Sequence, residues 1–166
     1  MDSLLTIDYK NNAVTEWAGK VGDAIGKGLL AGAAGTAAIT ASQMIEMKID
    51  GRKPSTAPEQ AAEKVFDIEP KDDKAKEHIN QQMHWSYGVS WGIPRAILHL
   101  FGIKGSAATA IHFGAVMGTA MVMLPSMKLA PPVKEWGAKE IAIEALHHAV
   151  YAVTAGLICD AIFDEE

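Results

Sequence analysis

The chain has 166 residues, enough for one compact domain, and 49% of them are hydrophobic, which excludes a disordered protein. With 15 basic and 20 acidic residues the net charge is −5, so nucleic acid is not an expected partner. A single cysteine, Cys159, excludes an internal disulfide and a cysteine metal cluster. The mean hydropathy of +0.07 is high for a soluble domain.

Two long stretches of the chain carry no charge. The stretch 105–127 is about 23 residues long, and a helix needs about 20 to cross the hydrocarbon core of a bilayer. The stretch 28–45, with about 18 residues, is at the lower limit. These stretches favour a polytopic membrane protein over a soluble bundle. The first 23 residues are charged and lack an apolar core, so no secretory signal is expected.

The N-terminal half predicts a surface segment, a membrane span and a polar segment. Residues 1–23 are expected to form a short surface helix with Trp17 at the membrane interface. The first span is expected at 24–47, where Gly28-x-x-x-Gly32 has the spacing that lets two membrane helices approach closely. Residues 48–77 are turn-rich and polar, and form a short cytoplasmic amphipathic segment. In that segment Thr56-x-x-Glu59 predicts a capping box, and Pro70 predicts a second helix start.

Three further spans are predicted in the C-terminal half, at 78–101, 106–127 and 136–163. Pro94 should kink the first of these because it has no backbone N–H to donate. Gly114-x-x-x-Gly118 predicts close packing of the next one. The resulting fold class is all-α: one domain forming an integral membrane four-helix bundle. Most lysines and arginines fall in 48–77 and in the turn 128–139, so the positive-inside rule puts these segments in the cytoplasm and both termini outside.

Ionisable and aromatic side chains recur on one face of two predicted spans. Four residues of the last span fall within an arc of about 80°, and so do four of the span at 78–101. Because lipid cannot solvate such groups, they are expected to point into the bundle. The predicted ligand or proton site consists of His84, Tyr87, Arg95, Glu140, Glu144, His148 and Tyr151.

A metal or a haem is a further candidate for this site. Imidazole and carboxylate ligands suit zinc, manganese or iron, and the candidate metal ligands are His84, His112, Glu144 and His148. Glu144-x-x-His147 has the spacing of di-iron bundles, but no second copy occurs, which argues against a di-iron site. A non-covalent haem between His84 and His148 stays open, whereas covalent haem attachment lacks its motif. Serine-nucleophile motifs and phosphate-binding loops are absent.

The same side chains also have a structural interpretation. A membrane histidine often only bonds a neighbouring helix, Glu140 suits a helix N-terminus, and Arg95 needs a carboxylate partner. Two functions are therefore predicted. The first is a protein that binds a proton, a metal ion or a small ligand within the bilayer. The second is a homo-oligomer or an assembly subunit of a larger membrane complex, in which polar residues serve packing. An enzyme acting on lipid is a third and weaker alternative.

The order of these motifs resembles a known family. After the small-residue first span come His84-x-x-Tyr87-Gly88, then Met123-Leu-Pro125 and Ala130-Pro-Pro132, and finally Glu140-x-x-x-Glu144-x-x-x-His148-Ala-Val-Tyr151. Over about residues 24–160 this pattern is similar to the uncharacterised YagU-like bacterial inner-membrane proteins. The resemblance implies a multi-pass protein of the inner (cytoplasmic) membrane, loosely associated with acid tolerance, with no established activity. The family pattern has a histidine just before Leu124-Pro125, where this chain has Val122 and Met123.

Overall fold

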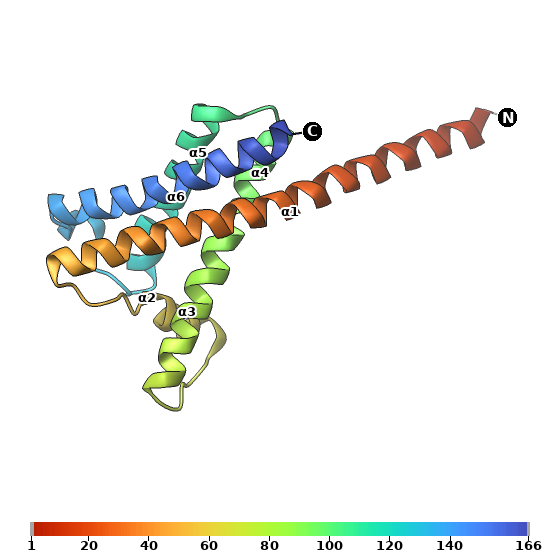
Figure 1. The fold of residues 1–166 in the computed structure, drawn as a ribbon. Coiled ribbons are helices and arrows are strands. Elements are labelled where there is room, and N and C mark those ends of the chain that lie inside the picture. Colours follow the sequence, from red (N-terminus) through yellow and green to blue (C-terminus); the bar gives the residue numbers. More distant parts are fainter. Residues whose placement is uncertain (1, 166) are drawn as a thin grey trace.

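The computed structural model describes the backbone of residues 2–165 and the side chains of residues 12–165, and it confirms the all-α prediction (Figure 1). The elements in chain order are α1 (Asp2–Asp50), α2 (Ala57–Phe66), α3 (Asp73–Ser90), α4 (Gly92–Leu100), α5 (Gly105–Ser126), the short 3-10 turn η1 (Val133–Glu135) and α6 (Ala138–Asp164).

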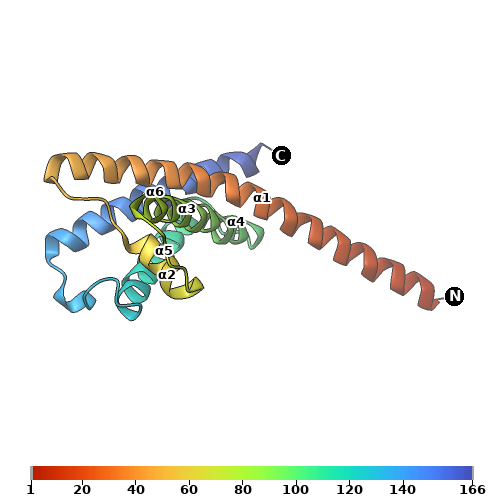
Figure 2. The ribbon, with the colours of Figure 1, turned by 90° about the horizontal axis from the view of Figure 1, so that it is seen from below.

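Helix α1 is one continuous helix of 49 residues. The expected separate surface helix before residue 24 is therefore wrong, because no proline or capping stop interrupts the backbone hydrogen bonds there. Its N-terminal part projects beyond the other helices (Figure 2), and residues 12–20 are all exposed. Trp17, with 51% of its surface exposed, lies on this projecting part.

Helices α1 and α6 lie side by side and antiparallel (Figures 1 and 2). At one end of the pair, Lys139 Nζ lies 2.7 Å from Asp50 Oδ2. At the other end, Lys27 Nζ lies 4.5 Å from the centre of the Phe163 ring. Small residues fill the space between, since a Cβ on Gly35 would lie only 2.8 Å from the Tyr151 ring. This packing brings the two helices close along most of the length of α6.

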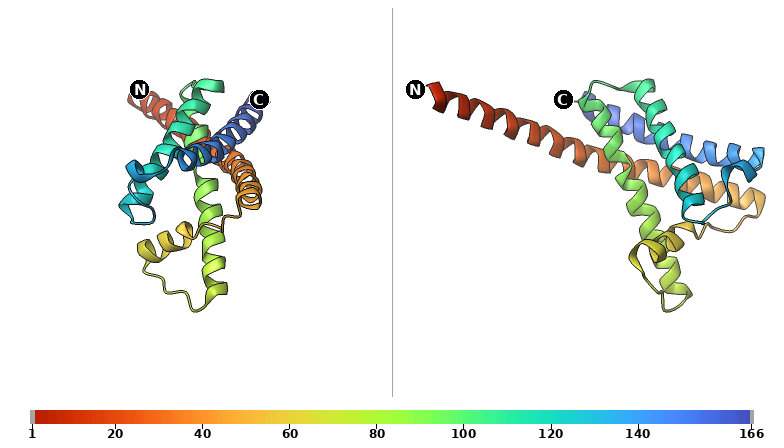
Figure 3. Two further views of the ribbon diagram at one scale, coloured as in Figure 1. Left: turned by 90° about the vertical axis from the view of Figure 1, so that its left-hand side faces the viewer. Right: turned by 180° about the vertical axis from the view of Figure 1, so that it is seen from behind.

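The α3–α4 segment crosses α1 where both helices carry glycine (Figure 3). A Cβ added to Gly28 would lie 2.7 Å from the carbonyl oxygen of Gly92, and one added to Gly32 would collide with the carbonyl of Val89. The close approach predicted from Gly28-x-x-x-Gly32 is therefore confirmed. The equivalent prediction for Gly114-x-x-x-Gly118 is wrong, because a Cβ at either position meets nothing within 4 Å in the described chain.

The predicted span at 78–101 is divided into two helices. Helix α3 ends at Ser90 and α4 begins at Gly92, because Pro94 has no N–H to donate to the Ser90 carbonyl. Within residues 12–165, three helical stretches are long and apolar enough to cross a membrane, namely Asn12–Asp50, Gly105–Ser126 and Ala138–Asp164. Neither α3 nor α4 is among them, since α3 begins with charged residues and α4 has nine residues.

The polar segment folds as a hairpin of α2 and α3. The capping box expected at its start does not form, because the Thr56 hydroxyl accepts from the Gln60 side chain and the Glu59 N–H donates to the Asn80 side chain. Helix α3 begins after Asp72, whose carboxylate accepts from the Ala75 N–H at 2.8 Å. The second helix start therefore lies later in the chain than the one expected from Pro70.

Candidate functional site

One ionisable side chain buried between α1 and α6 is His147. It is fully buried, and its Nδ1 lies 2.8 Å from the Ser42 hydroxyl. Its Nε2 has no hydrogen-bond partner among the described residues and lies 3.9 Å from Glu46 Oε2. Because Ser42 and Glu46 are one helical turn apart on α1, they approach the same imidazole from the same helix face. We call Ser42, Glu46, Arg52 and His147 the His147 site.

Arg52 fixes the carboxylate of this site. It lies in the loop after α1, and its Nε donates to both oxygens of Glu46, at 3.1 and 3.0 Å, while Nη2 donates to Oε2 at 2.6 Å. These bonds raise the pKa of the Arg52 guanidinium above its ordinary value, so Arg52 stays charged. The Glu46 side chain is 13% exposed and that of Arg52 is 40% exposed. The His147 site therefore reaches solvent through this ion pair.

The sequence prediction selected the neighbouring histidine. His148 Nδ1 lies 2.8 Å from the Glu144 carbonyl oxygen and 3.8 Å from its carboxylate, so these two residues contact each other on α6. The Glu144 charge also acts on Arg52 and helps to raise the pKa of its guanidinium. The buried face of α6 instead follows the four-residue spacing His147, Tyr151, Ala155 and Cys159. At about 100° per residue the small residues at 152, 155, 156 and 159 lie closer in phase to His148 than to His147, so this run gives no signal for His147.

Other predicted site residues bond separately along the helices. His84 Nε2 lies 2.9 Å from the Thr40 hydroxyl on α1. The Tyr151 hydroxyl donates to the Gly88 carbonyl at 2.7 Å. His112 is buried, with its Nε2 2.9 Å from the Trp91 carbonyl. Each bond links two different helical segments, so these three residues hold the helices together.

Two more predicted residues lie at the margins of this arrangement. Tyr87 is 39% exposed and packs its ring edge against Trp91. Glu140 accepts from the Gly137 N–H at 2.7 Å, at the exposed start of α6. This contact agrees with the interpretation that Glu140 stabilises the N-terminus of its helix.

The candidate metal ligands are not gathered. Within residues 12–165 no group of three or more histidine, cysteine, aspartate or glutamate side chains lies close enough to hold a metal ion. His84 contacts α1, His112 contacts the α3–α4 junction, and His148 contacts its own helix. The metal and haem predictions therefore gain no geometric support here.

A second charged cluster lies at the other end of the α1–α6 pair. Arg95 of α4 is fully buried, and its Nη2 lies 2.7 Å from Asp160 Oδ1. Asp160 Oδ2 accepts from the Gly105 N–H at 3.2 Å, and His99 Nδ1 lies 3.9 Å from Oδ1. Sequence reasoning missed Asp160. A buried Arg95 needs a counter-ion, and this need could have pointed to Asp160. Asp160 is the first carboxylate after the uncharged half of α6.

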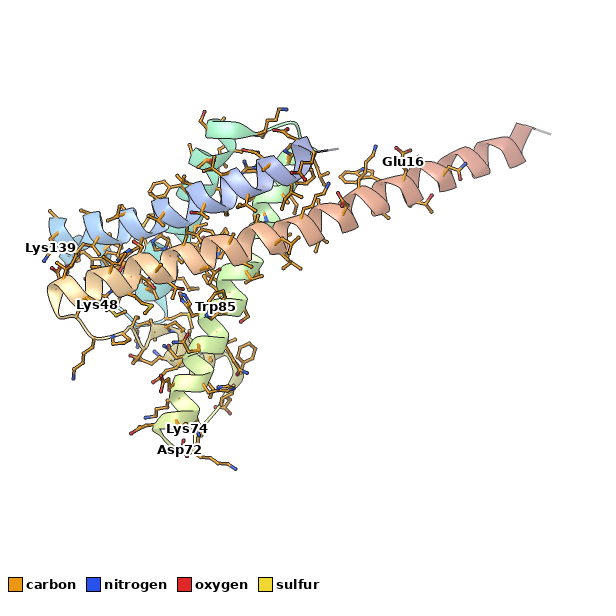
Figure 4. All side chains as sticks on the ribbon, in the orientation of Figure 1. Glu16, Lys48, Asp72, Lys74, Trp85 and Lys139 are labelled. Carbon is orange, nitrogen blue, oxygen red and sulfur yellow. The ribbon has the colours of Figure 1, made fainter. Side chains whose placement is uncertain are left out.

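Figure 4 shows Lys139 and Lys48 together at the α1–α6 end nearest the His147 site, with Trp85 on α3.

No family model, curated protein or solved structure matches the chain. The similarity to YagU-like proteins therefore rests on the sequence motifs alone.

Proposed function

We propose that the chain is a multi-pass protein of the bacterial inner membrane that binds a proton at the His147 site. The observation that carries the proposal is the buried Nε2 of His147, which has no hydrogen-bond partner among the described residues and lies 3.9 Å from the Glu46 carboxylate. An ionisable group enclosed between membrane helices is a functional candidate by default. The bacterial inner membrane is inferred from the resemblance to YagU-like proteins.

Chain connectivity supports four membrane passages. The Asp50–Lys139 ion pair puts the end of α1 and the start of α6 at one side, and the Asp160–Gly105 hydrogen bond puts the start of α5 at the opposite side. The chain between Asp50 and Gly105 therefore passes from one side to the other, through α3 and α4. The α3–α4 segment is less apolar than a span exposed to lipid. Part of it is covered by α1, which its glycines contact.

The His147 site then lies near the side with most of the basic residues. By the positive-inside rule this side faces the cytoplasm, and both termini face outward. The half-exposed Arg52 and the partly exposed Glu46 link the buried imidazole to water at that side. A proton can therefore reach His147 from the cytoplasm without crossing the apolar part of the bundle.

The chemistry of the site suits a proton better than a larger ligand. An imidazole is the side chain whose ordinary titration lies between pH 5 and 8. When Nε2 gains a proton, it becomes a donor facing Glu46, while Nδ1 donates to the Ser42 hydroxyl. Arg52 keeps the carboxylate ionised and in place. Protonation thus converts an unpartnered buried nitrogen into one member of an ion pair.

Histidine-selective ¹⁵N NMR on the purified protein in detergent tests this proposal. We expect the His147 signals to change reversibly between pH 5 and 8. Glu46→Gln should reduce the fraction of His147 imidazolium at a given pH, because it removes the facing negative charge. The exposed Glu77→Gln serves as the matched control and should leave the titration unchanged. A His147 signal that stays constant over this range in the wild type would end the proposal.

A second candidate function is a structural subunit of a larger membrane complex or a homo-oligomer. The observation that favours it is that His84, His112 and Tyr151 each have a partner on another segment, as helix-packing residues do. Under this alternative, gentle extraction should retain a stoichiometric partner or a defined oligomer. His147→Gln should then lower stability without altering any pH response.

A further inference from the structure

An open groove runs between α5 and α6 on the outside of the helix assembly. Its volume is about 440 Å³, within the range of roughly 300–1,000 Å³ typical of small-ligand sites. Small and apolar side chains form most of its walls, and Phe113 and Leu157 are the largest of them. The lining residues are Gly105, Ser106, Thr109, Ala110, Phe113, Ala149, Ala152, Val153, Leu157 and Asp160.

Asp160 is the only ionisable residue lining the groove, and it lies at the end where α5 begins. Its side chain is 21% exposed. One oxygen accepts from Arg95 and the other from the Gly105 N–H. An ionised carboxylate offers about four lone-pair positions, so these two bonds leave acceptor capacity facing the groove.

A lysine lies next in sequence to the glycine that binds this carboxylate. Lys104 immediately precedes Gly105, its side chain is 64% exposed, and its Nζ lies 4.0 Å from the equally exposed Asp164. A pair so exposed is weak and readily exchanges partners. The end of the groove therefore presents an available cation at Lys104 and an available acceptor at Asp160, next to apolar walls.

We propose that this groove binds one phospholipid with a primary ammonium headgroup. Its hydrocarbon chain lies along the apolar walls between Phe113 and Val153, its phosphate pairs with Lys104, and its ammonium donates to Asp160. A purely anionic headgroup would set negative charge against Asp160 with no positive charge to offset it. This inference rests on the membrane location in the proposed function, and is independent of proton binding at His147.

Competition between lipids of matched chain length tests the headgroup. The full chain, purified in detergent, is incubated with equimolar phosphatidylethanolamine and phosphatidylglycerol, and bound lipid is measured by native mass spectrometry. We expect one phosphatidylethanolamine to be retained in preference. Phosphatidylcholine should be retained less well, because a quaternary ammonium has no N–H to donate to Asp160. Equal retention of the three lipids would overturn the proposal.

Substitutions in the groove test its location. Val153→Trp fills the apolar part and should weaken phosphatidylethanolamine retention about tenfold, the equivalent of roughly two unburied methylene groups. Leu146→Trp is the matched control, because Leu146 is 58% exposed on α6 and does not line the groove. Unchanged retention in Val153→Trp, or an equal loss in both variants, would place the lipid elsewhere.

The charged end is tested through Lys104, because Asp160→Asn would leave Arg95 without its counter-ion and endanger the fold. Lys104→Gln should reduce the preference for phosphatidylethanolamine several-fold, and an unchanged preference would contradict the role of Lys104. The histidine NMR titration should be unaltered in Val153→Trp. A failure of lipid binding can therefore be told apart from a failure of proton binding.

Discussion

The two ends of the α1–α6 pair carry buried charge in different ways. At the Asp160 end, a permanently charged guanidinium meets a carboxylate at 2.7 Å, and that carboxylate also accepts from a backbone N–H. At the His147 end, the buried group is an imidazole whose charge depends on pH, and the Glu46 carboxylate lies 3.9 Å away and is already held by Arg52. The first end holds a fixed ion pair, whereas the charge at the second end depends on whether the imidazole is protonated.

The difference follows from the residue types. Arginine cannot lose its proton in a protein, so a buried Arg95 requires an anion at all times and holds α4 against α6. A histidine can be buried in its neutral form, and it then needs no counter-ion until it is protonated. Permanent charge thus serves assembly at one end, and titratable charge is available for binding at the other.

The largest effect on this comparison is expected from Arg95→Met. Removing the guanidinium leaves the partly buried Asp160 without its cation, and breaking a buried ion pair typically lowers the free energy of unfolding by about 3–5 kcal/mol. The double variant Arg95→Met/Asp160→Leu should recover much of the loss. Lys139→Gln, which breaks the exposed pair with Asp50, should cause no measurable change. The stability of all three variants is measured by unfolding in detergent or denaturant, followed by circular dichroism. An equal loss in Arg95→Met and Lys139→Gln would contradict the difference between the buried and the exposed ion pair.

A smaller effect is expected at the glycine crossing that separates the two ends. In Gly92→Ala, the new Cβ would collide with the Gly28 carbonyl oxygen and lie 2.7 Å from Gly32 Cα, and overpacking against backbone of this kind costs at least about 1–3 kcal/mol. Gly118→Ala meets open space and should be neutral or slightly stabilising, because alanine favours a helix. The same unfolding measurement compares the two. Loss of stability in Gly118→Ala alone would mean that α5, and not the crossing, is tightly packed.

The smallest effect is expected from Ser42→Ala. It removes one hydrogen bond to His147 Nδ1, which contributes about 1 kcal/mol to the free energy of unfolding. Ser90→Ala is the control, because its hydroxyl bonds only the Tyr87 carbonyl of its own helix. Under the proposed function Ser42→Ala should also shift the NMR titration of His147, and Ser90→Ala should not. Identical behaviour of the two variants would mean that Ser42 has no part in the site.

Sequence reasoning reached the helical architecture through short-range features. The uncharged stretches predict long apolar helices, Pro94 predicts the interruption near Trp91, and Gly28-x-x-x-Gly32 predicts a close crossing. These features depend on composition or on local hydrogen bonding, which a single chain segment contains. The partner of the Gly28 motif, in contrast, is Gly92 on a segment far along the chain, and nothing local distinguishes it from Gly114.

The candidate site was harder to predict because it depends on helix phase. A shift of one residue on α6, from His148 to His147, turns a side chain by about 100° and exchanges a contact within the helix for a contact across it. The pattern of apolar and polar residues at 140–151, considered on an isolated helix, does not show which face of α6 packs against the other helices. The phase is seen only in the packed structure, where His147 lies against Ser42 and Glu46.

The unbroken course of α1 has a mechanical consequence. At about 1.5 Å per residue, the helix is roughly 74 Å long, more than twice the hydrocarbon thickness of about 30 Å. The exposed length around Trp17 and the turn that carries Ser42 and Glu46 belong to the same rod, with no hinge between them. A torque applied to the outer length would turn these two side chains about the helix axis and change their distance from His147. Helix α1 thus links its exposed N-terminal part to the His147 site through one unbroken helix.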